Sequence, residues 1–311
     1  MTAPAPDTRL FELELLGGAW ERRYRSARPE VEAMPWETLD PREYTEEVLA
    51  AARSSWTAAA FQEHRTAAAC ASTLRALVEA CAPLDLIAAF SRFPLDEIVH
   101  VELCARMAMA LGGGAQLRYA DSAICADANP ALPPLLRATE LVVRNFCVGE
   151  ALSIPLLHGA WRRATHPLAH AVLGRIVRDE AAHGIVGWSF LDWALPQLDA
   201  DGVAFVRFTA EAAIGEIRRL WDHLARRPLS PGSDGHPLGW LGSHAYLTIA
   251  ERSLRARVVA PFAARGIDLS AAADQVENIS SAARATTLSE DGRRVEEQRS
   301  MPASGVKQLL R

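Results

Sequence analysis

The sequence has no long hydrophobic run and no excess of basic residues, and each absence excludes a class of protein. No apolar run in its 311 residues reaches the ~20 needed to cross a bilayer as a helix. A net charge of -5 gives no electrostatic footprint for nucleic acid or an anionic membrane. The start of the chain lacks a basic region followed by an apolar one, so we expect no secretory signal there. These absences favour a protein without nucleic-acid or membrane partners.

Cysteine is also scarce and is not arranged for metal binding or cross-linking. The five cysteines form no C-x-x-C pair, and their number is odd. We therefore expect reduced thiols in a cytoplasmic protein.

Strand-like alternation of β-branched and polar residues is almost absent, and helix-favouring residues dominate instead. The chain is 50% hydrophobic, which is enough for a substantial core. We predict one all-α domain at 41–285, after an irregular lead-in (1–40) and before a polar tail (286–311). The pair Asp40-Pro41 predicts the start of the first helix, and Ala82-Pro83 predicts its end. Helices are expected at about 42–81, 85–111, 135–161 and 168–195, with a long connection at 112–134 and two further helices at about 203–227 and 243–265.

One pattern occurs twice, as Asp96-Glu97-Ile98-Val99-His100 and as Asp179-Glu180-Ala181-Ala182-His183. A Glu and a His three residues apart lie on one face of a helix, so both can reach a common metal. In both copies the Glu and the His are the only polar members of an otherwise apolar stripe. A buried carboxylate without a partner is costly, so each stripe requires a cation or a partner there.

The lengths of the predicted hairpins identify two more acids. The midpoint of 63 and 97 is residue 80, beside the first predicted turn, so Glu63 lies level with Glu97. The midpoint of 150 and 180 is residue 165, in the second predicted turn, so Glu150 lies level with Glu180. Glu79 lies roughly 160° around the helix from Glu63 and faces away.

Together these residues form a set of four carboxylates and two imidazoles, which suits two Fe ions, two Mn ions or a mixed pair. We also expect Asp96 and Asp179 to accept a bond from the free ring nitrogen of a ligand His, although both could be ordinary surface acids. Two coincidental motifs on buried faces remain the alternative. The predicted metal ligands are Glu63, Glu97, His100, Glu150, Glu180 and His183.

These two Glu…Asp-Glu-x-x-His units resemble those of the ferritin-like superfamily, and especially of its diiron arylamine N-oxygenases. In this chain 32 residues separate Glu63 from Asp96, and 28 separate Glu150 from Asp179. The resemblance covers roughly residues 42–196. It implies a four-helix bundle with a long crossover between helices two and three, and with additional C-terminal helices. Those oxygenases carry a further His one turn before the second-motif Glu, where this chain has Ile176, so arylamine oxidation does not follow.

The resemblance implies a diiron oxidase or oxygenase that uses O₂ to oxidise a small organic substrate. An external electron donor, a reductase or ferredoxin, is expected because no flavin, haem or iron–sulfur motif is present. A ferroxidase or peroxide-protective protein and a non-catalytic, metal-stabilised scaffold are the alternatives, and a homodimer is compatible with the sequence. Arg175 and Arg178 are expected on a solvated face. Core packing is favoured over substrate contact for four residues that flank the site at helical spacing: Trp56, Met107, Phe146 and Phe190.

Overall fold

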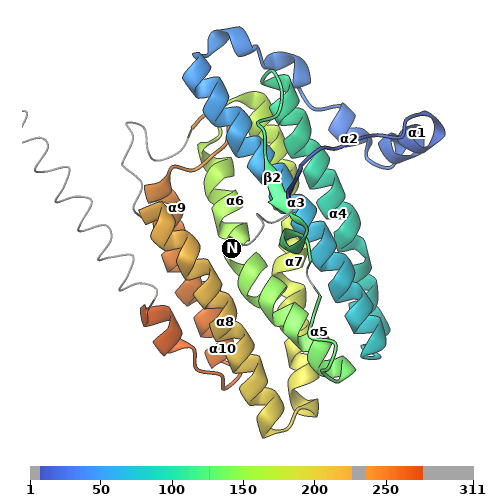
Figure 1. Ribbon diagram of the computed structural model, residues 1–311, viewed down its shortest axis with the longest axis vertical. Coiled ribbons are helices and arrows are strands. Elements are labelled where there is room, and N and C mark those ends of the chain that lie inside the picture. Colours follow the sequence, from blue (N-terminus) through green and yellow to red (C-terminus); the bar gives the residue numbers. More distant parts are fainter. Residues whose placement is uncertain (1–7, 126, 226–235, 276–311) are drawn as a thin grey trace, which may run out of the picture.

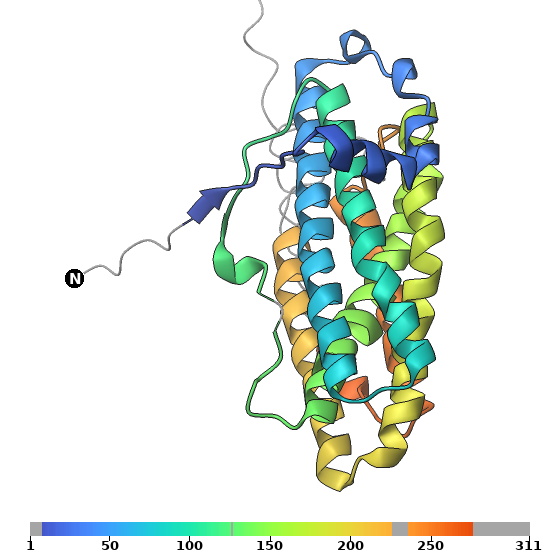
Figure 2. The same ribbon diagram turned by 90° about the vertical axis from the view of Figure 1, so that its right-hand side faces the viewer.

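The computed structural model describes residues 8–125, 127–225 and 236–275 and is predominantly helical, as the composition predicts. The two short strands in this part of the chain, β1 (Thr8–Leu10) and β2 (Arg118–Ala120), form an antiparallel pair. Four long helical segments run along the same axis and pack together (Figures 1 and 2). The predicted polar tail at 286–311 and the predicted domain end at 285 lie outside the described residues.

The first hairpin consists of α3 (Glu46–Glu79) and α4 (Leu84–Ala110). The predicted helix start at Asp40-Pro41 is wrong for α3: that pair begins η2 (Pro41–Glu43), a single 3₁₀ turn. Extended backbone at Tyr44 then separates this turn from α3, where the Thr45 side chain accepts a bond from the Val48 amide as a second cap. α4 continues through Pro94 without a break.

The second hairpin consists of a third helix in three parts and of α7 (Pro167–Ala194). The three parts of the third helix are α5 (Pro134–Val142), η4 (Val143–Glu150) and α6 (Ala151–Arg163), and η4 is π-helical. The described residues between the two hairpins, 111–125 and 127–133, run along the outside of α3 and include η3 (Asp121–Ala123) (Figure 2). The expected long crossover is therefore present.

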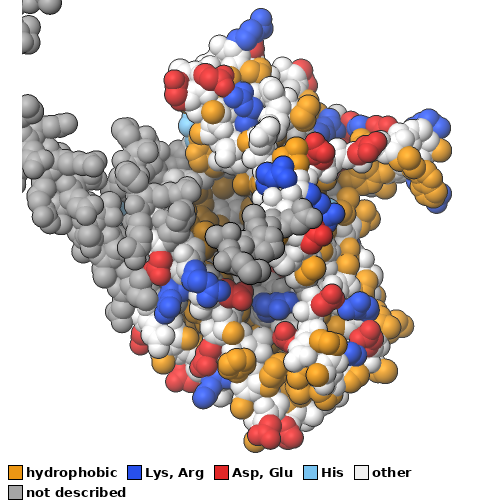
Figure 3. All heavy atoms as spheres, viewed as in Figure 1, with side chains coloured by type: hydrophobic (Ala, Val, Ile, Leu, Met, Phe, Trp, Pro, Cys, Tyr) orange, Lys and Arg blue, Asp and Glu red, His pale blue; other side chains and the backbone are white. Residues whose placement is uncertain are grey.

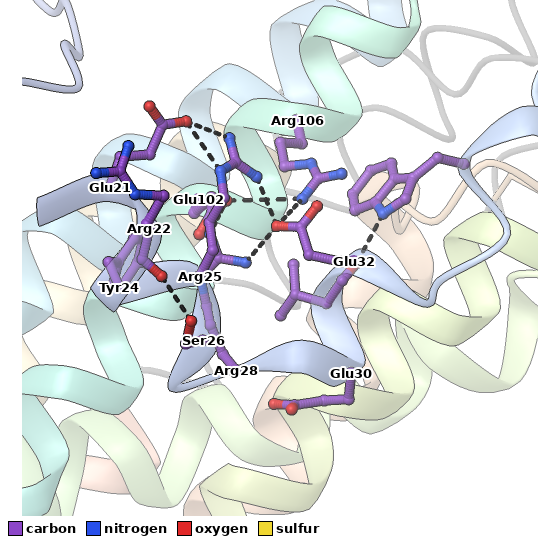
Figure 4. A network of polar contacts seen from close by, with 12 residues as sticks. Glu21, Arg22, Tyr24, Arg25, Ser26, Arg28, Glu30, Glu32, Glu102 and Arg106 are labelled. Carbon is purple, nitrogen blue, oxygen red and sulfur yellow. Dashed lines mark hydrogen bonds and ion pairs between the residues drawn. The ribbon is translucent and has the colours of Figure 1, made fainter. Parts of the chain in front are cut away.

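Within the predicted irregular lead-in of 1–40, residues 18–38 form short helices. They are α1 (Gly18–Ser26), α2 (Pro29–Glu32) and η1 (Trp36–Thr38). The buried guanidinium of Arg28 holds this segment on α4 by an ion pair to Glu102 at 2.6 Å, and it also pairs with Glu32 of α2 at 2.9 Å (Figure 4). Such short helices are not stable on their own, so contacts with the bundle must stabilise them. Local sequence propensity therefore predicts them poorly.

The C-terminal helices lie alongside the third helix rather than over an end of the bundle (Figure 1). α8 (Ala200–Ala225) packs on η4, and α9 (Ser243–Ser253) packs on α6. α6 and α9 approach each other closely at Gly159, where a Cβ atom would lie 2.4 Å from the Ile249 side chain. η5 (Leu195–Gln197) precedes α8, whereas η6 (Leu254–Val259) and α10 (Ala260–Ala263) follow α9.

The face of the molecule seen in Figure 3 mixes acidic, basic and hydrophobic side chains among the described residues. Exposed hydrophobic residues include Leu84, Leu95 and Ile98 on α4. Among the described residues, one helical segment, Pro134–Arg163, is long and apolar enough to cross a membrane by length and composition alone. Half of its apolar window is buried within the protein, and a single helix of this kind is weak evidence for a membrane span.

Candidate metal centre

Six acidic and imidazole side chains meet between the four long helical segments. Glu63 comes from α3, Glu97 and His100 from α4, Glu150 from the end of η4, and Glu180 and His183 from α7. Their ligand atoms form two overlapping groups, in each of which the atoms lie within 4.8 Å of one another. The structure thus brings together all six residues that the sequence places in one cluster. The first group is Glu63, Glu97, His100 and Glu180, and the second is Glu97, Glu150, Glu180 and His183.

Glu97 and Glu180 belong to both groups and lie between the two imidazoles. Glu97 places Oε2 at 3.5 Å from His100 Nδ1 and Oε1 at 3.1 Å from His183 Nδ1. Glu180 places Oε1 at 3.4 Å from His100 Nδ1 and Oε2 at 3.0 Å from His183 Nδ1. Each of these carboxylates therefore presents one oxygen to each side of the cluster. Glu63 completes the group on one side, and Glu150 completes the group on the other.

The π-helical stretch and one glycine bring Glu150 to this cluster. A π turn contains an extra residue, so it rotates the side chains that follow relative to a continuous α-helix. Across it Val143, Phe146, Cys147 and Glu150 are all buried. α7 approaches it closely at Gly187, two turns after Glu180, where a Cβ atom would lie 2.8 Å from the Phe146 Cβ. Gly187 therefore permits the close packing that brings Glu150 to Glu180.

The cluster contains buried polar atoms that have no hydrogen-bond partner in the protein. They include both oxygens of Glu97, Oε2 of Glu180, and Nδ1 of both His100 and His183. Each such atom costs on the order of 1–3 kcal/mol when nothing satisfies it. Carboxylate oxygens and imidazole nitrogens are suitable ligands for Fe or Mn. The residues present therefore fit a metal site, although they do not decide which ion it would hold.

Without metal, the charges within the cluster balance through shifted pKa values. Burial, and then the charge of Glu97, raises the pKa of Glu63 well above its ordinary value, and burial with Glu180 does the same for Glu150. Burial opposes ionisation of Glu180, but the adjacent imidazoles of His100 and His183 outweigh it and lower its pKa to about 2. Burial likewise opposes the charge on His183, yet the nearby carboxylates of Asp96, Glu180 and Glu97 raise its pKa to about 12. Protons thus supply the positive charge that cations would supply.

We expect metal affinity to rise with pH, because metal and protons compete for the same ligand atoms. Metal binding must displace a proton from each imidazole, which predicts a gain of at least about tenfold in affinity per pH unit between about pH 6 and 8. Competition with a chelator of known affinity, performed at several pH values on metal-free protein, measures this slope. An affinity that does not change over this range would contradict the protonated cluster.

The two acids that precede the motif glutamates contact the imidazoles in a crossed arrangement. Asp179 Oδ2 lies 3.1 Å from Nε2 of His100, and Asp96 Oδ2 lies 3.9 Å from Nε2 of His183. Each Asp thus faces the His of the other motif. When His100 Nε2 donates to Asp179, the Nδ1 lone pair points to the cluster, which is the orientation that a metal ligand needs.

Two arginines complete this arrangement, and the sequence analysis missed both. Arg92 Nε lies 3.1 Å from Asp96 Oδ2, and Arg175 forms an ion pair with Asp179. The sequence predicts that both Arg175 and Arg178 lie on a solvated face. Arg178 is exposed as predicted, but the prediction is wrong for Arg175, whose side chain is only 12% exposed. A signal was present: both copies of the motif have an Arg four residues before the Asp, as R-x-x-x-D-E-x-x-H.

Apolar side chains enclose the cluster. Phe93, a member of the apolar stripe, places its ring centroid 4.0 Å from that of His183, and Phe146 packs 5.8 Å from Phe93. Trp56 uses its indole N–H to bind the Leu238 carbonyl at 3.0 Å. All four residues considered for a substrate pocket are buried, as core packing predicts: Trp56, Met107, Phe146 and Phe190.

From the sequence we also expect an apolar cavity beside the cluster, open to an organic ligand, and this stays a prediction. A pocket of about 240 Å³ lies on the surface between α8 and the third helix, where Glu140, Arg144, Phe205 and Phe208 are among its lining residues. None of the six clustered residues lines that pocket.

Comparison of the chain with protein-family models, curated proteins and solved structures gave no match. The protein is predominantly helical and contains a buried carboxylate–histidine cluster that could bind a metal.

Proposed function

We propose that this chain is a ferritin-like, non-haem diiron oxidase or oxygenase that uses O₂ to oxidise a small organic molecule. The observation that carries the proposal is the pair Glu97 and Glu180, shared between two imidazoles and flanked by one further carboxylate on each side. A structural site for one ion would need neither the duplication nor the shared carboxylates. Two Mn ions or a mixed pair would fit the same ligands.

The ligand residues are suited to two metal ions whose charge changes during turnover. Four carboxylates offset two divalent cations, and Glu63 and Glu150 are each free to serve one ion alone. Bound in the reduced state, two such ions supply the electrons that O₂ activation requires. Phe93 and Phe146 keep water from the cluster, which protects a reactive site from side reactions.

The reaction needs partners that the chain itself does not contain. One turnover of an oxygenase places one oxygen atom in the substrate and reduces the other to water, which consumes two electrons and two protons. The sequence carries no flavin, haem or iron–sulfur motif, so we propose a separate reductase or ferredoxin as the donor. The substrate would be small enough to reach the cluster between the helices.

The chain beyond α7 favours an oxygenase over an iron-storage protein. All six ligands lie before residue 184, and the four long helical segments end by Ala194. α8 and α9 then pack on the segment that carries Glu150, without supplying any member of the cluster. Iron storage has no need of them, whereas an enzyme can use them to shape access to its substrate.

The test compares organic oxidation with iron oxidation in one preparation. Iron-loaded protein is reduced chemically, O₂ is admitted in the presence of host metabolites, and oxygen-dependent products are sought by mass spectrometry. We expect a metabolite to gain oxygen or lose hydrogen. If no metabolite changes while added Fe(II) is oxidised over many turnovers, the protein is a ferroxidase instead. If metal-free protein retains its full function, the metal serves only as a scaffold.

A further inference from the structure

The two halves of the cluster are supported unequally. On one side Asp179 lies at hydrogen-bond distance from His100 and is paired with Arg175, whose Nε lies 3.3 Å from Glu30 of α2. On the other side Asp96 lies 3.9 Å from His183, beyond hydrogen-bond distance, and its partner Arg92 is 69% exposed. The same R-x-x-x-D motif therefore forms a buried support on one side and a solvent-exposed one on the other.

Burial makes the first support stronger. The side chains of Arg175 and Asp179 are 12% and 6% exposed, so water and salt screen their attraction little. The pair of Arg92 and Asp96 is weaker: Asp96 is buried, but the Arg92 side chain is 69% exposed, so water competes for the guanidinium and fixing it costs side-chain entropy. The Arg175 support can consequently hold the imidazole of His100 in one orientation.

The N-terminal segment fixes the outer end of this support. α2 carries Glu30, and Arg28 beside it is pinned to Glu102 of α4 (Figure 4). The Trp36 indole N–H binds the Val31 carbonyl at 2.7 Å, which closes the segment behind α2. Glu30 thus stands on an anchored element, and the chain of contacts runs from α2 through Arg175 and Asp179 to His100.

We propose that Arg175 and Glu30 are positioning residues that make the metal position of Glu63 and His100 the tighter of the two. The inference rests on the proposed dimetal centre, which it deepens by assigning an order of loading. A rigid imidazole loses less freedom when it binds metal, so this position fills first. The position of Glu150 and His183 fills second, because its imidazole is less restrained.

Co(II) titration of the full-length, metal-free protein tests the proposal without any measurement of activity. Wild-type protein should bind two ions in two steps, and His100→Ala should abolish the tighter step, which identifies it. Arg175→Gln should weaken that step roughly 10–100-fold, the usual effect of removing a partner that orients a ligand. Glu30→Gln should weaken it in the same direction, and Arg175→Lys should restore part of the loss.

Arg92→Gln is the matched control, because Arg92 occupies the same place in the other motif. It should change either step by less than about fivefold, because the exposed guanidinium of Arg92 is screened by water. Thermal unfolding of the metal-free variants separates positioning from a merely structural role, which would lower the melting temperature but leave Co(II) affinity unchanged. Should Arg175→Gln fail to fold, Glu30→Gln carries the test, because Glu30 is 46% exposed.

Equal effects of Arg92→Gln and Arg175→Gln, or no effect of Glu30→Gln and Arg175→Gln on the tighter step, would overturn the assignment. Wild-type protein that binds no metal would instead refute the proposed function, so the two failures are distinct.

Discussion

His100→Ala and His183→Ala are each expected to reduce metal content from two ions per chain to about one. His100→Ala removes a ligand from the group that contains Glu63 but leaves the group of Glu97, Glu150, Glu180 and His183 complete. His183→Ala does the reverse. The double variant should hold almost no metal, because its four buried carboxylates would lack both imidazoles.

Mass spectrometry of metal in protein purified from its native host gives the stoichiometry and also identifies the ion. His244→Ala provides the control, since His244 is exposed at the start of α9 and lies outside the cluster. Two ions per chain in both single variants would remove the basis for assigning these ligands.

Glu180→Gln is expected to reduce O₂ consumption by the reduced, iron-loaded protein by at least about 100-fold, more than the 10–100-fold typical of partners outside the ligand set. Glu180 presents one oxygen to each side of the cluster, so the substitution affects both metal positions. It also removes a negative charge that the two cations need. The side chain keeps its size, which limits the change to charge and coordination.

An oxygen electrode measures this rate after one chemical reduction, with metal content determined on the same sample. Glu140→Gln is the matched control: Glu140 is a partly buried carboxylate on α5 that bonds the Asn129 amide and lies outside the cluster. Retention of a wild-type rate by Glu180→Gln at full metal content would argue against a shared carboxylate in the reaction.

The sequence by itself determined the helices and the six clustered residues. Helical periodicity placed Glu97 with His100, and Glu180 with His183, on buried faces. Short turns then fixed which residues lie level across each hairpin, so counting from the turns was enough to find Glu63 and Glu150. Both inferences depend on local geometry, which a short stretch of sequence specifies. The sequence did not predict the N-terminal helices, because α1 and α2 depend for their stability on contacts with α4.

Only the tertiary structure decided how these residues meet. Asp179 faces His100 across 79 positions of the chain, and Glu30 reaches Arg175 across 145. Such contacts depend on how the two hairpins pack, and no local pattern encodes that packing. The π-helical turn before Glu150 and the close approach at Gly187 arise in the same way. Helical periodicity specifies the face on which a side chain lies, whereas the packing of distant helices decides which partner it finds there and how firmly it is held.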